Sequence, residues 1–80
     1  MIIYRAYLDY GPYNGESDLG YFESIAGAYS AISNSCKERK FSLDRPTSEP
    51  GKTIYKALDY DGTSWCCDYK YIIKSIEVKP

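Results

Sequence analysis

The sequence predicts a single α+β domain over residues 1–80, in which one helix packs on one face of a four-stranded, twisted antiparallel sheet. Three observations predict this class. Polar and apolar residues alternate strictly near the N-terminus, apolar residues recur at helical spacing in the next third of the chain, and two later strand-like runs are joined by a turn signal. The expected order of elements is β-β-α-β-β, and eighty residues leave room for only a small core.

Residues 2–10 alternate with the period of a strand that has one buried face. The apolar face consists of Ile2, Tyr4, Ala6, Leu8 and Tyr10. We expect the first four of these to face the helix. A loop is predicted at residues 11–18, because Gly-Pro and Asn-Gly pairs interrupt regular structure there. Residues 19–23 are predicted to form a short second strand that pairs antiparallel with the first.

A helix is predicted to begin after Ser24, whose hydroxyl suits the N-cap position. Its apolar face consists of Ile25, Ala28, Tyr29, Ile32 and Cys36, at spacings of three and four residues. Gly27 and several serines in the same segment are poor helix formers. The helix must therefore be stabilised by packing on the sheet.

The C-terminal half is predicted to contain the other two strands. Prolines and a glycine indicate that residues 40–52 are irregular, and residues 53–60 form the third strand. Asp61-Gly62 is typical of a two-residue hairpin, which would place Ile54 opposite Tyr69. The apolar residues of the last strand change faces after Ile73, and we expect a bulge near residues 74–75 to explain the change.

The composition argues against the common catalytic chemistries. The chain has no histidine, which removes the most frequent general base and the usual activator of serine or cysteine nucleophiles. Neighbouring carboxylates, such as Asp59 with Asp61, flank a turn glycine, where Asp is favoured for backbone reasons. We therefore expect no enzymatic activity, no cofactor and no metal site.

The three cysteines indicate a reducing compartment. An odd number that includes adjacent Cys66 and Cys67 is a poor disulfide framework, so we expect three free thiols. The N-terminal residues do not resemble a signal peptide, and no apolar run is long enough to span a membrane. We therefore expect a cytoplasmic protein.

The most informative feature for function is the long loop between the first two strands. A two-residue turn would join these strands, and excess loop length in a small domain is often functional. The loop holds Tyr13 together with Glu16 and Asp18, and Tyr10 precedes it. We interpret these four residues as a partner-binding site in which the carboxylates attract a basic surface and the aromatic ring supplies an anchor.

A resemblance to known proteins supports a binding role. The run Leu19-Gly20-Tyr21-Phe22-Glu23-Ser24, an alanine-bearing helix and a closing Ile-rich strand at residues 71–78 resemble short domains encoded by bacteriophages. The size and the lack of catalytic groups are similar to anti-CRISPR and other anti-defence proteins. The resemblance implies an inhibitor that blocks a host protein or ribonucleoprotein complex in the host cytoplasm.

Two alternatives remain open at this point. Lysines 56, 70 and 74 could meet the phosphates of single-stranded nucleic acid while aromatic residues of the sheet stack on bases, although a net charge of −1 makes direct nucleic-acid binding the weaker interpretation. A small ligand-binding or regulatory subunit is the other alternative. The sequence also leaves a homodimer open.

Overall fold

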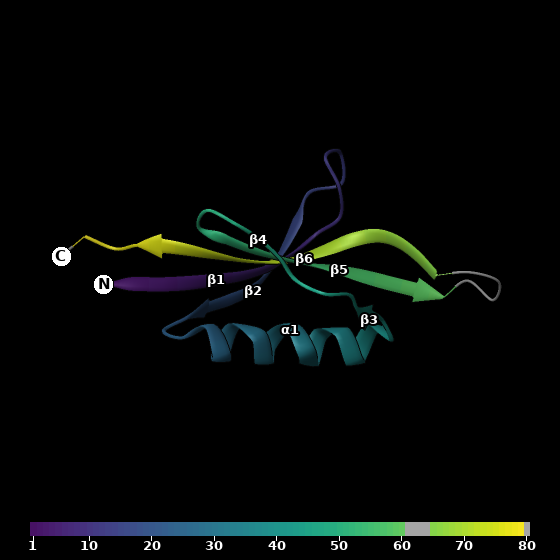
Figure 1. The fold of residues 1–80 in the computed structure, drawn as a ribbon, viewed down its shortest axis with the longest axis horizontal. Coiled ribbons are helices and arrows are strands. Elements are labelled where there is room, and N and C mark those ends of the chain that lie inside the picture. The colour runs from purple at the N-terminus through teal and green to yellow at the C-terminus, as the bar shows by residue number, and fades with distance from the viewer. Residues whose placement is uncertain (61–64, 80) are drawn as a thin grey trace.

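A computed structural model describes the backbone of residues 1–60 and 65–79, and the side chains of residues 1–59 and 69–79. The α+β class is confirmed, because one helix lies along one side of an antiparallel sheet (Figure 1). The sheet has six strands in the described residues, whereas the sequence predicted four.

The described elements are β1 (Ile2–Asp9), β2 (Glu16–Phe22), α1 (Ile25–Arg39), β3 (Ser42–Leu43), β4 (Thr47–Glu49), β5 (Lys52–Tyr60) and β6 (Trp65–Glu77). The strand order is β2-β1-β6-β5-β3, and β4 also pairs with β5. Strands β1 and β6 therefore lie in the middle of the sheet. Strand β2 begins three residues earlier than predicted, which shortens the preceding loop.

The two additional strands fall in the segment predicted to be irregular. β3 and β4 are two and three residues long, and both pair with the same edge of β5. Gly51, with φ of 74°, provides the left-handed turn that reverses the chain from β4 into β5. Prolines in this segment are compatible with strands this short at a sheet edge.

The register of the last hairpin differs from the prediction. Ile54 pairs with Ile72 instead of Tyr69, and a shift in the register lies between Ala57 and Asp59. Tyr60 pairs with Trp65, and the Asp61-Gly62 turn itself lies outside the described residues. The turn signal therefore predicted the hairpin but not its register.

The bulge predicted at residues 74–75 is also wrong. The pairing of β1 with β6 is continuous from Ile2 opposite Glu77 to Asp9 opposite Lys70. The apolar side chains change faces because the side of the sheet away from the helix has apolar residues of its own. Ile76 pairs with Ile3 on that side, and Tyr7 pairs with Ile72.

The core lies between α1 and the middle of the sheet. Its buried members from β1 and α1 are Ala6, Leu8, Ala28, Ile32 and Cys36, and the other strands add Ala57, Tyr71 and Ile73. Ser24 caps the helix as predicted, since its hydroxyl accepts a hydrogen bond of 3.1 Å from the Gly27 amide.

The core is shorter than the two apolar faces, or stripes, that were predicted for residues 2–10 and for the helix. Ile2 and Ile25 are each 52% exposed, and Tyr29 is 44% exposed, so these three residues extend past the buried cluster. Tyr4 packs at the edge of the cluster. The stripes were therefore placed on the correct faces, but their N-terminal ends are open to solvent.

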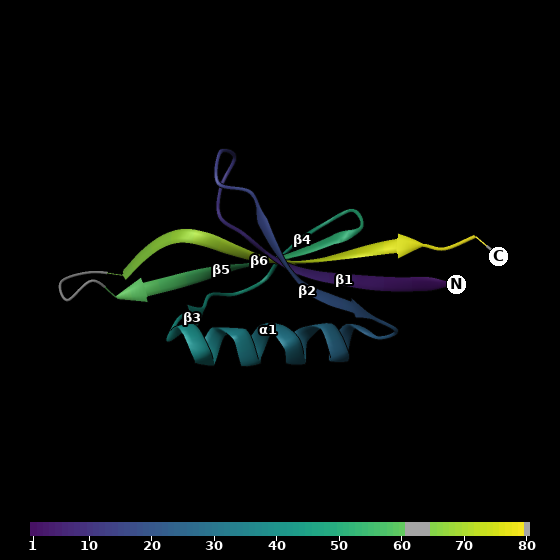
Figure 2. The same ribbon diagram turned by 180° about the vertical axis from the view of Figure 1, so that it is seen from behind.

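The other face of the sheet has no helix over it in the described residues, as the two opposite views show (Figures 1 and 2). The β1–β2 and β4–β5 hairpins both rise on that side. No described helix is long and apolar enough to cross a membrane.

Candidate functional site

The turn between β1 and β2 is held by four hydrogen bonds. The Tyr10 amide donates to the Gly15 carbonyl at 3.1 Å, and the Asn14 amide donates to the Gly11 carbonyl at 3.3 Å. The Asn14 side chain donates to the Tyr10 carbonyl, and the Gly11 amide donates to the Asp9 carboxylate at 2.9 Å. These bonds give the turn a defined shape, with Tyr13 at its tip and 97% exposed.

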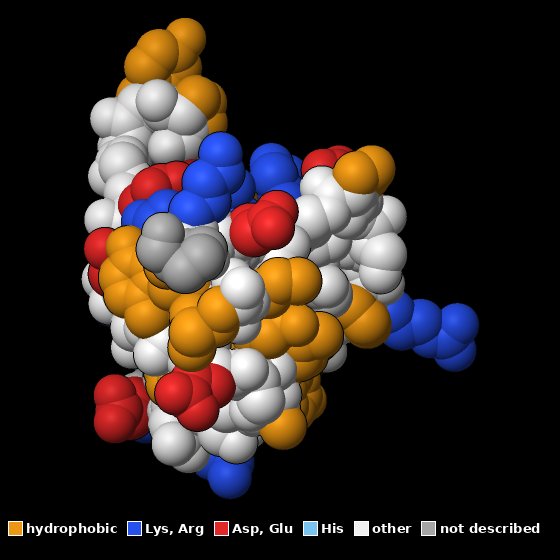
Figure 3. Space-filling view, turned by 90° about the vertical axis from the view of Figure 1, so that its left-hand side faces the viewer, with side chains coloured by type: hydrophobic (Ala, Val, Ile, Leu, Met, Phe, Trp, Pro, Cys, Tyr) orange, Lys and Arg blue, Asp and Glu red, His pale blue; other side chains and the backbone are white. Residues whose placement is uncertain are grey.

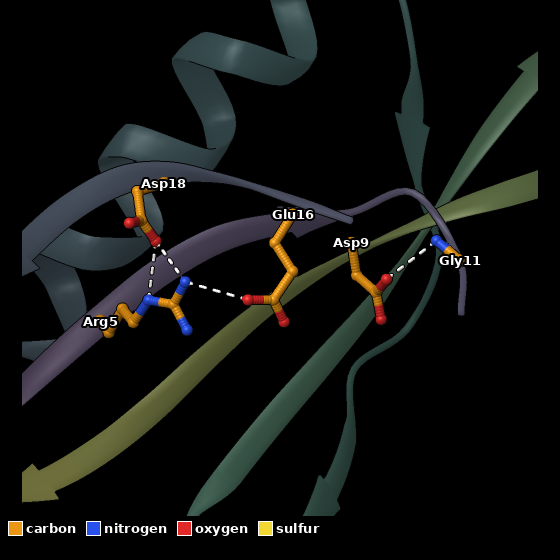
Figure 4. A network of polar contacts seen from close by, with 5 residues as sticks. All are labelled: Arg5, Asp9, Gly11, Glu16 and Asp18. Carbon is orange, nitrogen blue, oxygen red and sulfur yellow. Dashed lines mark hydrogen bonds and ion pairs between the residues drawn. The ribbon is translucent and has the colours of Figure 1, made fainter. Parts of the chain in front are cut away.

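The two carboxylates of the predicted site lie below this turn, in β2, and both contact one arginine (Figure 4). Arg5 of β1 donates to Asp18 through Nε at 2.7 Å and to Glu16 through Nη2 at 3.1 Å. Burial disfavours the charge on Arg5, but the bonds to the two carboxylates outweigh it and raise the pKa of the guanidinium. Glu16 and Asp18 are therefore not free charges, although both remain about half exposed.

Arg5 also lies 4.1 Å from the centre of the Tyr7 ring, which is only 5% exposed. The side chain thus links β1 and β2 on the side of the sheet away from the helix and covers an aromatic ring at the same time. Burial, together with the nearby Glu16 charge, raises the pKa of the Tyr7 phenol.

Tyr10 occupies a different environment. Its ring packs edge-on against Tyr69 at 5.5 Å, and its hydroxyl accepts a hydrogen bond from Arg39 of α1. Tyr10 therefore packs at the helix side of the sheet, at the border of the core.

The four residues predicted to bind a partner do not form one cluster. Glu16 and Asp18 share Arg5, Tyr13 stands alone at the tip of the turn, and Tyr10 packs toward the helix. Of the four, Tyr13 is the residue that is almost fully exposed. At the base of the hairpin Asp9, Glu16 and Asp18 lie near Arg5 (Figure 4), and Lys70 of β6 pairs with Asp9 across the sheet.

A second candidate site is an open cleft at the N-terminal end of α1, with a volume of about 310 Å³. Its apolar lining consists of Ile2, Tyr4, Ile25 and Ile73, and its polar rim includes Ser48, Glu49, Lys52, Thr53 and Ser75. Figure 3 looks at this end of the molecule, and hydrophobic side chains gather in the lower half of the view, on the helix side. The volume is near the lower end of small-molecule sites.

The sequence did not predict this cleft. Its lining comes from β1, α1, β6 and the β4–β5 hairpin, and residues 48–52 of that hairpin had been predicted to be irregular. The only available signal was the excess of apolar residues at the N-terminal ends of the two stripes.

Reactive groups among the described residues are few. Cys36 is a buried free thiol whose Sγ donates to the Phe41 carbonyl, and burial raises the pKa of that thiol. A raised pKa favours the unreactive protonated form. Within the described part of the chain, no three His, Cys, Asp or Glu side chains lie close enough to hold a metal ion. Cys66 and Cys67 lie outside the described side chains.

No protein-family model matches the chain, and the searches of curated proteins and of solved structures gave no match either.

Proposed function

We propose that the chain is a non-enzymatic binding protein of the phage anti-defence type, which occupies a surface of a host defence complex through the β1–β2 hairpin. The observation that carries the proposal is the position of Tyr13, whose ring is 97% exposed at the tip of a hydrogen-bonded turn. Tyrosine is enriched among the residues that dominate protein interfaces, because its ring buries apolar area while its hydroxyl keeps a polar partner.

The construction of the turn favours binding. Four hydrogen bonds fix the backbone around Tyr13, and the hairpin rises clear of the sheet (Figure 1). A preformed loop loses less conformational entropy when a partner binds, so more of the contact energy contributes to affinity. Tyr13 therefore meets two requirements of an anchor, namely exposure and preorganisation.

The charge below the tip favours a partner with a basic surface. Glu16 and Asp18 are about half exposed although both contact Arg5, so a basic partner can still reach them. Such charges increase the rate of encounter more than the final affinity. Defence complexes that hold nucleic acid present basic surfaces of this kind.

The proposal is tested by plasmid survival in a bacterium that carries an active CRISPR system directed against the plasmid. Expression of the wild-type chain should raise survival, and expression of Tyr13→Ala should not. The matched control is Tyr21→Ala, because Tyr21 is 59% exposed but lies in β2, away from the turn. A parallel strain without the defence system measures any general effect on transformation.

Both variants should unfold like the wild type, since neither ring is buried. If the wild-type chain gives no protection against any defence type in a panel of strains, the anti-defence role is wrong. If Tyr13→Ala protects as well as the wild type, the hairpin tip is not the contact.

A further inference from the structure

Lysines from β5 and β6 gather on the face of the sheet that points away from α1. The members of this lysine face are Lys52, Lys56, Lys70 and Lys74. The register places Lys56 directly opposite Lys70, and Lys52 directly opposite Lys74. On their other sides Lys74 pairs with Arg5 of β1, Lys70 pairs with Asp9 of β1, and Lys52 pairs with Glu49 of β4. Neighbouring strands are about 4.8 Å apart, so each lysine–lysine pair holds two like charges side by side.

The two lysine–lysine pairs do not serve stability, because like charges directly opposite one another destabilise a sheet. Three of the four lysines are exposed and Lys52 is half-buried. No ion pair of any of the four occurs in the described part of the chain, where the ion pairs are those of Arg5 with Glu16 and Asp18. The lysine face therefore holds positive charge that an anionic partner would neutralise.

The surface between the lysines favours phosphates over a protein. The row between the two lysine pairs consists of Tyr7, Ile72 and Ile54, and the first two are each only 5% exposed. Protein interfaces are depleted in lysine, whereas four lysines surround this row. Lysine binds phosphate as a point charge and imposes no fixed geometry on it.

We propose that the lysine face binds the phosphate backbone of single-stranded nucleic acid without reading its sequence. The face is two strands wide, and its two lysine pairs lie about 14 Å apart along the strands. A surface this narrow can contact the phosphates of one nucleic-acid strand. Figure 3 shows Lys and Arg side chains in the upper half of the view, which is the side away from α1, with Asp and Glu side chains among them. The proposal does not depend on the proposed function, because Tyr13 takes no part in it.

The test measures binding of a fluorescent oligo-dT over a series of salt concentrations. The oligonucleotide has about 16 nucleotides, which is the upper end of the length that one OB fold covers on a single strand. The wild type should bind at low salt, and log K should fall with log salt with a slope of about −3 for four contacts. Lys70→Gln with Lys74→Gln should weaken binding about tenfold at low salt and reduce the slope by about 1.4. A mixed-sequence strand should bind as tightly as oligo-dT.

The control changes the same amount of charge on the other side of the molecule, through Lys37→Gln with Lys40→Gln near the end of α1. It should leave affinity within about twofold and the slope unchanged. Equal losses in the two double variants would overturn the lysine face as the site. Tighter binding to a duplex than to the single strand would overturn the choice of a single strand. Equal or tighter binding to polyglutamate would overturn nucleic acid as the partner.

Discussion

Leu8 and Ile2 share one face of β1, yet they differ sharply in burial. Leu8 has no exposed surface in the core cluster, whereas Ile2 is 52% exposed at the open cleft. Truncating a buried side chain loses its transfer free energy and also leaves a cavity. Truncating a half-exposed side chain loses only part of the transfer free energy and leaves no closed cavity. The cost of truncation should therefore depend on position along the strand.

We expect Leu8→Ala to lower the free energy of unfolding by about 2–4 kcal/mol, and Ile2→Ala to lower it by less than about 1 kcal/mol. Urea unfolding followed by circular dichroism measures both. Equal effects of the two substitutions would mean that the cluster extends to the end of β1.

The partner-binding site expected around Tyr13 could be predicted only in part from the sequence. Tyr13 is exposed as its loop position suggested, but the partner of Glu16 and Asp18 is Arg5, which lies 11 and 13 residues earlier. The two strands have a register shift between Ala6 and Tyr7, which no local pattern encodes. The charges could be counted from the sequence, but their neutralisation depends on that register.

Among the helices and strands, sequence periodicity predicted the long elements, but it did not predict which residues pair across the sheet. The alternation in residues 2–10 and the helical spacing after Ser24 correspond to β1 and α1. β3 and β4 are too short to show a period, so their strand character comes from hydrogen bonds to the edge of β5. The register of β5 on β6, which assembles the lysine face, likewise depends on tertiary contacts.

Lys74 offers a test of this register that needs no ligand. It lies between Arg5 and Lys52 in one row across three strands. Because its removal relieves repulsion on both sides, Lys74→Gln should raise the free energy of unfolding by about 0.2–1 kcal/mol at low ionic strength. Salt screens exposed charges, so the gain should shrink at high salt.

The control for Lys74 is Lys37→Gln in the last turn of α1, where a cation interacts favourably with the helix dipole. This substitution should not raise stability. A loss of stability in Lys74→Gln, measured by the same urea titration, would contradict the row of like charges.

At the scale of the whole molecule, the fold is elongated for its size. Its Cα radius of gyration is 13.0 Å, with extents of 50 × 24 × 20 Å, whereas a compact chain of this length would have a radius of about 12 Å. One helix contacts β1, β2 and β6, so part of the long β5–β6 hairpin extends beyond it (Figure 1). The small core accordingly depends on tyrosines whose rings are buried while their hydroxyls find polar partners or the surface.

Because of these tyrosines, we expect the protein to lose stability at alkaline pH. Burial raises the pKa of the phenols of Tyr7, Tyr55 and Tyr71 and of the Cys36 thiol. For Tyr71 a hydrogen bond with Ser35 offsets part of this effect. All four groups hold their protons more tightly in the folded state. Their contribution to the free energy of unfolding is therefore fully present below the ordinary thiol pKa of about 8.5, and it is lost as pH rises through the phenol range near 10.

We expect the free energy of unfolding to be constant from about pH 6 to 8 and then to decline, with each buried group adding up to about 1.4 kcal/mol per pH unit. Tyr71→Phe removes one such group. It should lower stability at pH 7, because the bond to Ser35 is lost, and it should make the decline above pH 10 shallower. Tyr13→Phe, at the exposed tip, is the control for the loss of a tyrosine hydroxyl. Comparing variants at each pH cancels the effects of pH that all three proteins share. Parallel curves for Tyr71→Phe and the wild type above pH 10 would contradict a buried, neutral Tyr71 as a source of the alkaline transition.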